Sequence, residues 1–185
     1  MPEKNRVYID TCPFIDMAKF KAKLQLAPTP DARKDRESDV WTMTKLLEAS
    51  RDGEVQILTS MLTITECLFL GSEPDKIPDA DTQRFFSELL LSGKSGVATA
   101  SPSLAIMEEA RDLRWRKKIV LKPMDSLHVA TAIHHHCKEI LTHDRDLLSD
   151  SVRLPLEGMG LRVSYPRKTS YLPTKYAQQE MQEGR

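Results

Sequence analysis

The stretch from residue 119 to residue 148 constrains the fold most, because it combines a helix, a short apolar strand and an acidic turn. Pro123 predicts the helix start, since proline is accepted in the first helical turn and tolerated poorly further inside. Asp125 then lies in the first turn, on a face that is otherwise mostly apolar. Residues 140–142 are too few for a helix and predict a buried strand, which Asp144 follows closely.

Short apolar runs alternate with helical patterns along the chain. The runs predict strands at residues 7–9, 55–59, 97–100, 140–142 and 161–165. Helical spacing predicts helices at residues 11–24, 39–50, 61–70, 79–91 and 102–115, and a further helix from about residue 124. This alternation predicts an α/β fold, a three-layer α/β/α sandwich with a mostly parallel central sheet.

Polar segments interrupt this pattern. Residues 26–38 contain two prolines and many charges, and they predict a surface loop. Residues 72–78 predict a second loop, after a helix end at Gly71. Residues 166–185 predict an extended or poorly ordered tail, with a short helix at 175–181 as the alternative. The sequence therefore predicts one domain over residues 1–165 and a polar C-terminal tail over 166–185.

The composition limits the possible binding partners and the cellular compartment. Lys and Arg number 27, and so do Asp and Glu, so any nucleic-acid-binding surface must be a local basic patch. The three cysteines are widely spaced and suggest no disulfide framework, which favours a reducing, cytoplasmic compartment. The first residues lack the apolar run of a signal peptide, and no apolar stretch reaches the length of a membrane span, so we expect no membrane association.

Acidic residues recur where predicted strands end and helices begin. Asp10 ends the first strand, Glu66 interrupts the apolar stripe of a helix, Asp125 begins another helix, and Asp144 and Asp146 follow a strand. In a parallel sheet the strands end at the edge where the crossover helices begin, so we expect these carboxylates to converge. Open α/β sheets bind their ligands at that edge.

A cluster of carboxylates favours one kind of chemistry. Like charges held close together raise one another's pKa unless a cation neutralises them. No His or Cys stands at ligand spacing among these acids, so Mg²⁺ or Mn²⁺ suits the set better than zinc. Such an ion can activate a water and stabilise the departing oxygen of a phosphodiester.

Each acid also has a simpler interpretation. Asp10 could cap the next helix, and Asp125 could favour the helix dipole. Glu66 could form a structural salt bridge with an arginine, since an unpaired charge on an apolar stripe is costly. Asp146 could be a solvated turn residue. His128, one turn after Asp125, could approach the acids or serve only in packing.

A basic stretch precedes the acidic helix. Its cations could hold an RNA backbone, and the candidate RNA-binding residues are Arg114, Arg116, Lys117 and Lys122. Trp115 could stack on a base, or it could lie in the core.

The ordered motifs resemble those of the PIN-domain ribonucleases, and the match is closest to the VapC-like toxin branch. The segments are IDTCPFID, TSMLTITECL with Glu66, MDSLHVATAI and LTHDRDL, and together they span about four-fifths of the chain. The resemblance implies a PIN fold, a bound Mg²⁺ or Mn²⁺, and hydrolysis of single-stranded or loop RNA.

The resemblance also implies roles for individual residues. The catalytic, metal-binding acids would be Asp10, Glu66, Asp125 and Asp144, with Asp146 as a fifth metal ligand and Thr11 and Thr142 as supporting hydroxyls. It implies an RNA substrate, an antitoxin protein as a candidate partner, and a homodimer. The competing classes are a non-catalytic PIN-like module that binds RNA or protein, and a DNA nuclease.

Overall fold

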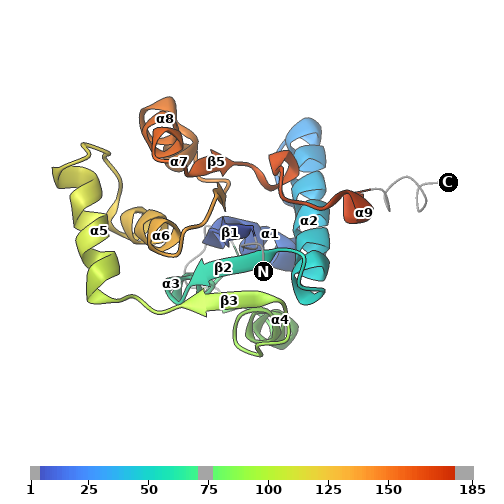
Figure 1. The fold of residues 1–185 in the computed structure, drawn as a ribbon. Helices are drawn as coiled ribbons and strands as arrows, with labels where there is room; N and C mark the ends of the chain where they lie inside the picture. Colours follow the sequence, from blue (N-terminus) through green and yellow to red (C-terminus); the bar gives the residue numbers. More distant parts are fainter. Residues whose placement is uncertain (1–4, 71–76, 178–185) are drawn as a thin grey trace.

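Five parallel strands form the central sheet, in the order β3-β2-β1-β4-β5 (Figure 1). The structure is a computed structural model that describes residues 5–70 and 77–177. The strands are β1 (Arg6–Ile9), β2 (Gln56–Ser60), β3 (Val97–Ala100), β4 (Glu139–Leu141) and β5 (Arg162–Ser164). Every neighbouring pair is parallel, which confirms the predicted α/β sandwich, and β5 lies at one edge of the sheet.

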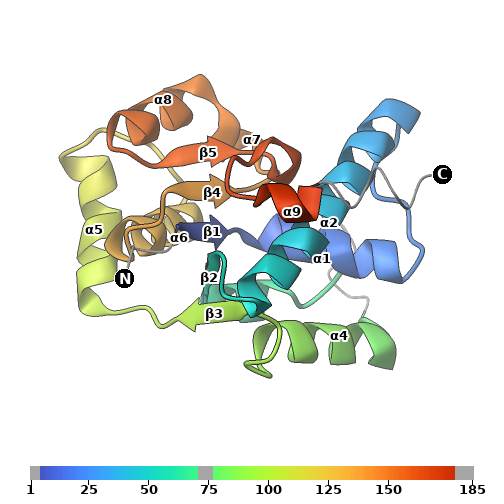
Figure 2. The same cartoon turned by 45° about the vertical axis from the view of Figure 1, so that its right-hand side comes forward.

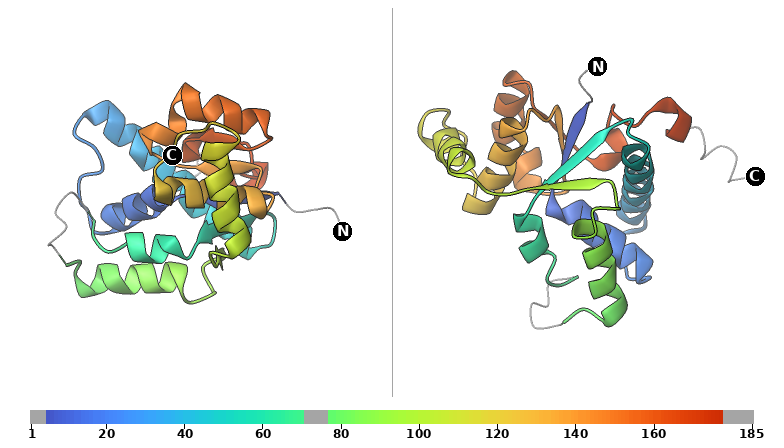
Figure 3. Two further views of the ribbon diagram at one scale, coloured as in Figure 1. Left: turned by 90° about the vertical axis from the view of Figure 1, so that its left-hand side faces the viewer. Right: turned by 60° about the horizontal axis from the view of Figure 1, so that its bottom comes forward.

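Helices cover both faces of the sheet (Figures 1 and 3). One face packs against α1 (Thr11–Lys21), α2 (Pro30–Arg51) and α4 (Ala80–Leu90). The other packs against α5 (Leu104–Trp115), α6 (Pro123–His134) and α8 (Asp150–Gly158). Alternate strand residues serve the two cores, because successive side chains of a strand point to opposite faces. In β1, Val7 and Ile9 face the first core and Tyr8 faces the second.

The register of the central strands fixes which residues meet at the carboxyl edge of the sheet. Ile9 pairs with Leu141, so the residues that follow them, Asp10 and Thr142, emerge side by side. The Asp10 backbone N–H donates to the Leu141 carbonyl over 3.1 Å, which continues the pairing one residue beyond the strand.

Helix α2 begins far earlier than the sequence analysis predicts, and the expected loop at 26–38 is wrong from Pro30 onward. Thr29 caps the helix by accepting from the Ala32 N–H, and Pro30 occupies the first turn, where proline is favoured. Most of the charges that suggested a loop are exposed on this helix, and one is half-buried. One of them, Arg36, pairs with Asp16 over 2.7 Å.

Helix α3 (Leu62–Glu66) is shorter than the predicted helix over 61–70. Ser60 belongs to β2, although its hydroxyl still accepts from the Leu62 N–H over 3.2 Å. The β-branched run Thr63-Ile64-Thr65 disfavours helix, and the chain leaves the helix at Cys67. The predicted helix end at Gly71 and the loop residues 72–76 lie outside the described residues.

Two helices follow β4 where the sequence analysis predicts only an acidic turn. Helix α7 (Arg145–Leu148) is capped by Asp144, and α8 buries Val152 and Leu156. The proline inside α8, Pro155, and the few apolar residues of this segment conceal its helical spacing.

Residues 166–177 are folded against α2, so the expected extended or poorly ordered tail is wrong for this part of the chain. They form a 3₁₀ turn, η1 (Pro166–Lys168), and a short helix, α9 (Thr174–Ala177), beside α2 in Figure 2. Tyr176 is buried in the first core. The helix predicted at 175–181 coincides with α9 up to residue 177, and its remainder lies outside the described residues. The domain boundary at residue 165 stays a prediction.

A buried ion-pair network ties this segment to the body. Asp39 of α2 is fully buried; its carboxylate accepts from the Arg167 backbone N–H over 2.8 Å and from the Arg167 guanidinium over 2.7 Å. The same carboxylate lies 3.0 Å from Nε2 of His143, which adjoins Asp144. Asp39 therefore links the C-terminal segment to the loop that carries one of the candidate acids.

Replacing Tyr176 with alanine tests whether the segment contributes to the fold. The variant should lose about 3 kcal/mol of unfolding free energy, because large-to-small core substitutions of aromatic residues cost about that much. Denaturant titration measures the change. Lys175→Ala is the control: it removes an exposed pair with Glu54 and a cation–π contact with the Tyr176 ring but leaves the ring buried, and it should cost about 1 kcal/mol or less. Equal stabilities of the two variants would contradict the packing of Tyr176.

Candidate functional site

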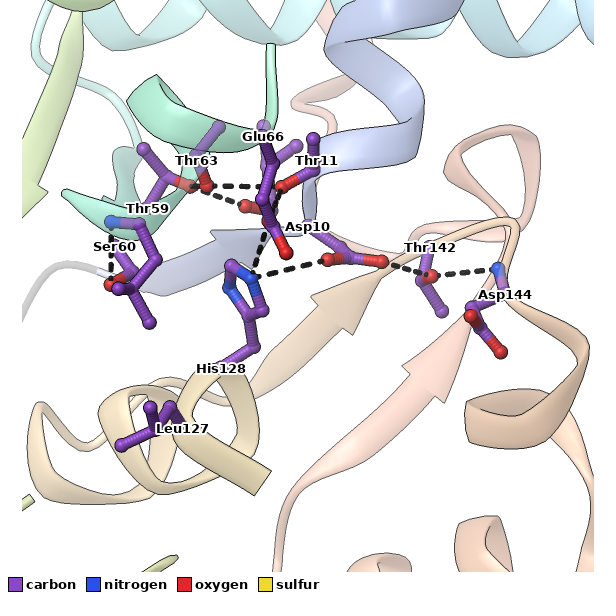
Figure 4. Close-up of polar contacts among 12 residues, drawn as sticks. Asp10, Thr11, Thr59, Ser60, Thr63, Glu66, Leu127, His128, Thr142 and Asp144 are labelled. Atoms are coloured by element: carbon purple, nitrogen blue, oxygen red, sulfur yellow. Dashed lines mark hydrogen bonds and ion pairs between the residues drawn. The ribbon is translucent and has the colours of Figure 1, made fainter. Parts of the chain in front are cut away.

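The carboxyl edge of the sheet brings Asp10 and Thr142 into contact (Figure 4). The Thr142 hydroxyl donates to Asp10 Oδ2 over 2.7 Å and accepts from the Asp144 backbone N–H over 2.9 Å. Asp10 is buried, and although it precedes α1, its side chain makes no capping hydrogen bond. The interpretation of Asp10 as a helix cap is therefore wrong.

Glu66 is held next to Asp10 by hydrogen bonds from two other elements. The Thr11 hydroxyl donates to Glu66 Oε2, and His128 Nε2 lies 2.8 Å from the same oxygen. His128 Nε2 is also 4.0 Å from Asp10 Oδ1, so its ring stands between the two carboxylates (Figure 4). The partner of Glu66 is thus a histidine rather than the arginine considered from the sequence.

Tyr8 fixes the orientation of His128 by contacting the ring nitrogen that does not face Glu66. The Tyr8 hydroxyl lies 2.6 Å from His128 Nδ1 and accepts from the Ser60 N–H over 3.0 Å. A proton on Nε2 lets His128 donate to Glu66 and accept from Tyr8. This tautomer gives both ring nitrogens and the Tyr8 hydroxyl a hydrogen-bond partner. His128 is therefore part of the site rather than a packing residue alone.

The same contacts shift the pKa values of this pair in opposite directions. Burial alone would raise the pKa of Glu66, but the hydrogen bonds from His128 and Thr11 outweigh it and lower that pKa. Burial would lower the pKa of His128, but the bond to Glu66 and the negative charges of Asp10 and Asp125 raise it. Glu66 is thus held as a carboxylate.

Asp125 has the least satisfied carboxylate of the site. Its Oδ2 is buried and has no hydrogen-bond partner among the described residues. Burial raises the pKa of Asp125, and the negative charges of Asp144 and Asp10 raise it further. A buried unpaired charge is costly, so this oxygen would be stabilised by a proton or by a cation.

The other two predicted acids differ from each other. Asp144 caps α7, and its Oδ1 accepts from the Asp146 N–H over 2.6 Å and the Leu147 N–H over 3.4 Å. Asp146 is exposed and pairs with Lys122 over 2.7 Å. The structure thus brings Asp10, Asp125 and Asp144 within electrostatic range, while Asp146 faces a lysine.

The donor set suits a hard divalent cation with few protein ligands. Within residues 5–70 and 77–177, no three His, Cys, Asp or Glu side chains converge on one point. Mg²⁺ does not require such a cage, since it keeps several waters and is commonly held by one or two carboxylates. The unpartnered Asp125 oxygen, with Asp10 and Asp144 close enough to raise its pKa, fits that mode of binding.

The predicted RNA-binding cations are mostly paired with acids. Arg116 lies 3.2 Å from Asp112, Lys117 pairs with Glu109, and Lys122 with Asp146. Arg114 has no acidic partner in the part of the chain that the structure describes. Trp115 is 63% exposed, so the interpretation that placed it in the core is wrong.

A comparison with protein-family models matches residues 35–150 to the PIN domain. This match covers more than half of the chain. The chain belongs to the PIN domain family. PIN domains are generally nucleases, and the matched region contains Glu66, Asp125, Asp144 and Asp146, while Asp10 precedes it. A search of the curated proteins found no match. No helix among the described residues of this PIN domain has the length and apolarity to span a bilayer.

Thr142→Val tests whether the hydroxyl between Asp10 and Asp144 supports a metal site. Loss of a hydrogen-bonded partner to a ligand typically weakens metal binding about 10- to 100-fold, and we expect that loss in calorimetric titrations with Mn²⁺. Thr131→Val is the matched control, because Thr131 is also buried but donates to the Leu127 carbonyl within α6 rather than to an acid. Equal Mn²⁺ affinity in the two variants would separate Thr142 from metal binding.

Asp125→Asn should stabilise the metal-free protein at neutral pH by up to about 2 kcal/mol, because it removes a charge from a crowded, half-buried site. A raised pKa means that the wild-type aspartate favours folding while protonated and loses that contribution as the pH rises through the folded-state pKa. The advantage of the variant should therefore vanish in acid, below the ordinary aspartate pKa. Denaturant titrations across pH measure it. Asp146→Asn, at an exposed pair, is the control; a variant advantage that grew in acid would contradict the raised pKa.

Proposed function

We propose that the protein is a metal-dependent endoribonuclease that hydrolyses phosphodiester bonds of single-stranded or loop RNA. The proposal rests chiefly on the unpartnered buried oxygen of Asp125, flanked by Asp10 and Asp144 at the carboxyl edge of a PIN domain. The proposed cofactor is Mg²⁺ or Mn²⁺, since both prefer oxygen ligands.

The residues of the site would have different roles in the hydrolysis. Hydrolysis joins a water oxygen to phosphorus and breaks the ester bond to the leaving oxygen. When bound, the divalent cation would neutralise the carboxylates, polarise the phosphate and make water more acidic. Asp125 would hold the cation through its unpartnered oxygen, with Asp10 and Asp144 beside it, and the proton that the water loses ends on the leaving oxygen. Thr142 holds Asp10 in place, and Thr11 and His128 hold Glu66.

A non-catalytic PIN module is the second candidate, and one observation favours it. Glu66 is already paired with His128, and no three potential ligands converge within the described residues. A module of this kind would bind RNA or protein without cutting it. Titration with Mn²⁺ separates the two, because only an intact site should bind the ion.

The biological setting follows from the resemblance to VapC-like toxins. We propose a homodimeric toxin whose antitoxin partner presents a basic side chain to the acidic edge, where Asp125 lacks a cation. A small open reading frame beside the gene, whose product inhibits the nuclease and binds it less tightly after Asp125→Asn, would support this setting. A stand-alone RNA-processing role is the outcome if no such inhibitor exists.

The decisive experiment is cleavage of a mixed-sequence single-stranded RNA in Mg²⁺, Mn²⁺ or EDTA. We expect metal-dependent cutting that falls at least about 100-fold in Asp125→Asn, since even the supporting partners of metal ligands matter 10- to 100-fold. Asp146→Asn is the control, because Asp146 pairs with Lys122 at the surface and should retain most activity.

Each other outcome has a defined meaning. Cutting that persists in EDTA would contradict the metal dependence. A stronger preference for flap or single-stranded DNA than for RNA would make the protein a DNA nuclease. Absence of both Mn²⁺ binding and cleavage would favour the non-catalytic module, whereas Mn²⁺ binding without cleavage of any tested nucleic acid would point to a narrow RNA target.

A further inference from the structure

A groove between α5 and α6 stands beside the acidic edge and is used by none of the contacts described above. Its volume is about 440 Å³, which lies within the range of ligand sites. Its floor contains the buried side chains of Ala110, Leu121 and Ser126. At its rim, Trp115 is 63% exposed and Met107 is 51% exposed.

The chain reversal after α5 builds this groove. Ile119 N–H donates to the Leu113 carbonyl over 2.9 Å, and Lys118 has a positive φ of 61°, a conformation that L-residues rarely adopt. The turn brings Leu121 and Pro123 back toward the end of α5, so that they line the same groove as Trp115. A large aromatic ring is thus held at the surface by the fold itself.

The positive charge of the groove favours a polyanion as its ligand. Arg111 and Arg114 line it, and no acidic residue does so within the described part of the chain. The Arg111 guanidinium lies 4.8 Å from the centre of the Trp115 ring, and Arg114 has no acidic partner there. Arg111 also lies 4.0 Å from Glu108. An aromatic surface beside arginine cations over an apolar floor is the combination that binds single-stranded nucleic acid, with bases on the ring and phosphates on the cations.

The position of the groove links it to the proposed reaction. Pro123, Ser126 and Leu127 of its wall belong to the first turns of α6, the same turns that carry Asp125 on their other face. Lys122, at the N-cap of α6 next to Pro123, pairs with Asp146. A strand bound in the groove therefore needs only to pass the N-terminal end of α6 to reach the acids.

We propose that this groove is a nucleobase subsite, in which Trp115 stacks on a base and Arg114 holds a phosphate of the RNA strand outside the scissile bond. The proposal rests on the proposed ribonuclease function and specifies its substrate as a single strand that extends past α6. A helix of a protein partner is the competing occupant, but it offers no reason for the groove to adjoin the acidic edge.

Trp115 itself supplies the readout. Trp41 is the other tryptophan of the chain, so Trp41→Phe leaves Trp115 as the reporter, and Asp125→Asn prevents cleavage. Adding an unstructured single-stranded RNA of about 12 nucleotides should quench the Trp115 fluorescence saturably, because bases stack on exposed rings. In the Asp125→Asn background, Trp115→Ala should weaken RNA binding about 10-fold, and Trp115→Phe should restore most of it.

The controls separate this subsite from the acidic edge. Leu104→Ala removes another exposed apolar residue of α5 outside the groove and should leave RNA affinity unchanged. Trp115→Ala should leave Mn²⁺ affinity unchanged. Arg114→Ala should reduce the slope of log affinity against log salt by about 0.7, and Arg116→Ala, whose partner Asp112 is 3.2 Å away, should reduce it less.

The results distinguish failure of the subsite from failure of the nuclease. Metal-dependent RNA cleavage by the wild type, together with unchanged RNA affinity in Trp115→Ala and Arg114→Ala, would overturn the subsite and leave the proposed function intact. A wild type that neither binds nor cuts RNA would overturn both. RNA binding without any change in Trp115 fluorescence would also count against the subsite and favour a protein occupant.

Discussion

The parallel pairing of β1 with β4 is the constraint on which the candidate site depends. Because Ile9 pairs with Leu141, the chain must place Asp10 and Thr142 side by side as the strands end. A slip of one residue would turn every side chain of the strand to the opposite face and separate the two. The apolar residues of both strands, buried in cores on both faces of the sheet, prevent that slip, so the geometry of the acids is set by packing some distance from them.

The sequence predicted the sheet well because its strands are short apolar runs with sharp ends, and β3 was predicted at its observed bounds. The failures have physical causes. Prolines and charges concealed the start of α2, where a threonine cap and a first-turn proline begin a helix instead. Local spacing could not show that the segment after residue 165 is held by contacts with α2, because those contacts join residues more than a hundred positions apart.

The sequence could predict those parts of the site whose positions follow from the order and direction of the strands and helices. The structure places Asp10 and Asp144 within electrostatic range of Asp125, although no three potential ligands meet at one point among the described residues. His128 was undervalued, although its place one turn after Asp125 was the available signal, and the role of Tyr8 had no signal because an aromatic residue in a strand predicts core. The metal-binding and catalytic roles of these residues stay predictions.

The contact between Asp39 and Arg167 has a consequence for how this domain is delimited. The matched PIN region ends at residue 150, yet the guanidinium that neutralises a fully buried carboxylate comes from beyond it. In a fragment ending at residue 165, Asp39 would keep only His143 as a partner. A shift of His143 would then also move Asp144, the next residue in the chain. The guanidinium that balances this buried carboxylate thus belongs to a stretch of chain that the family similarity does not cover.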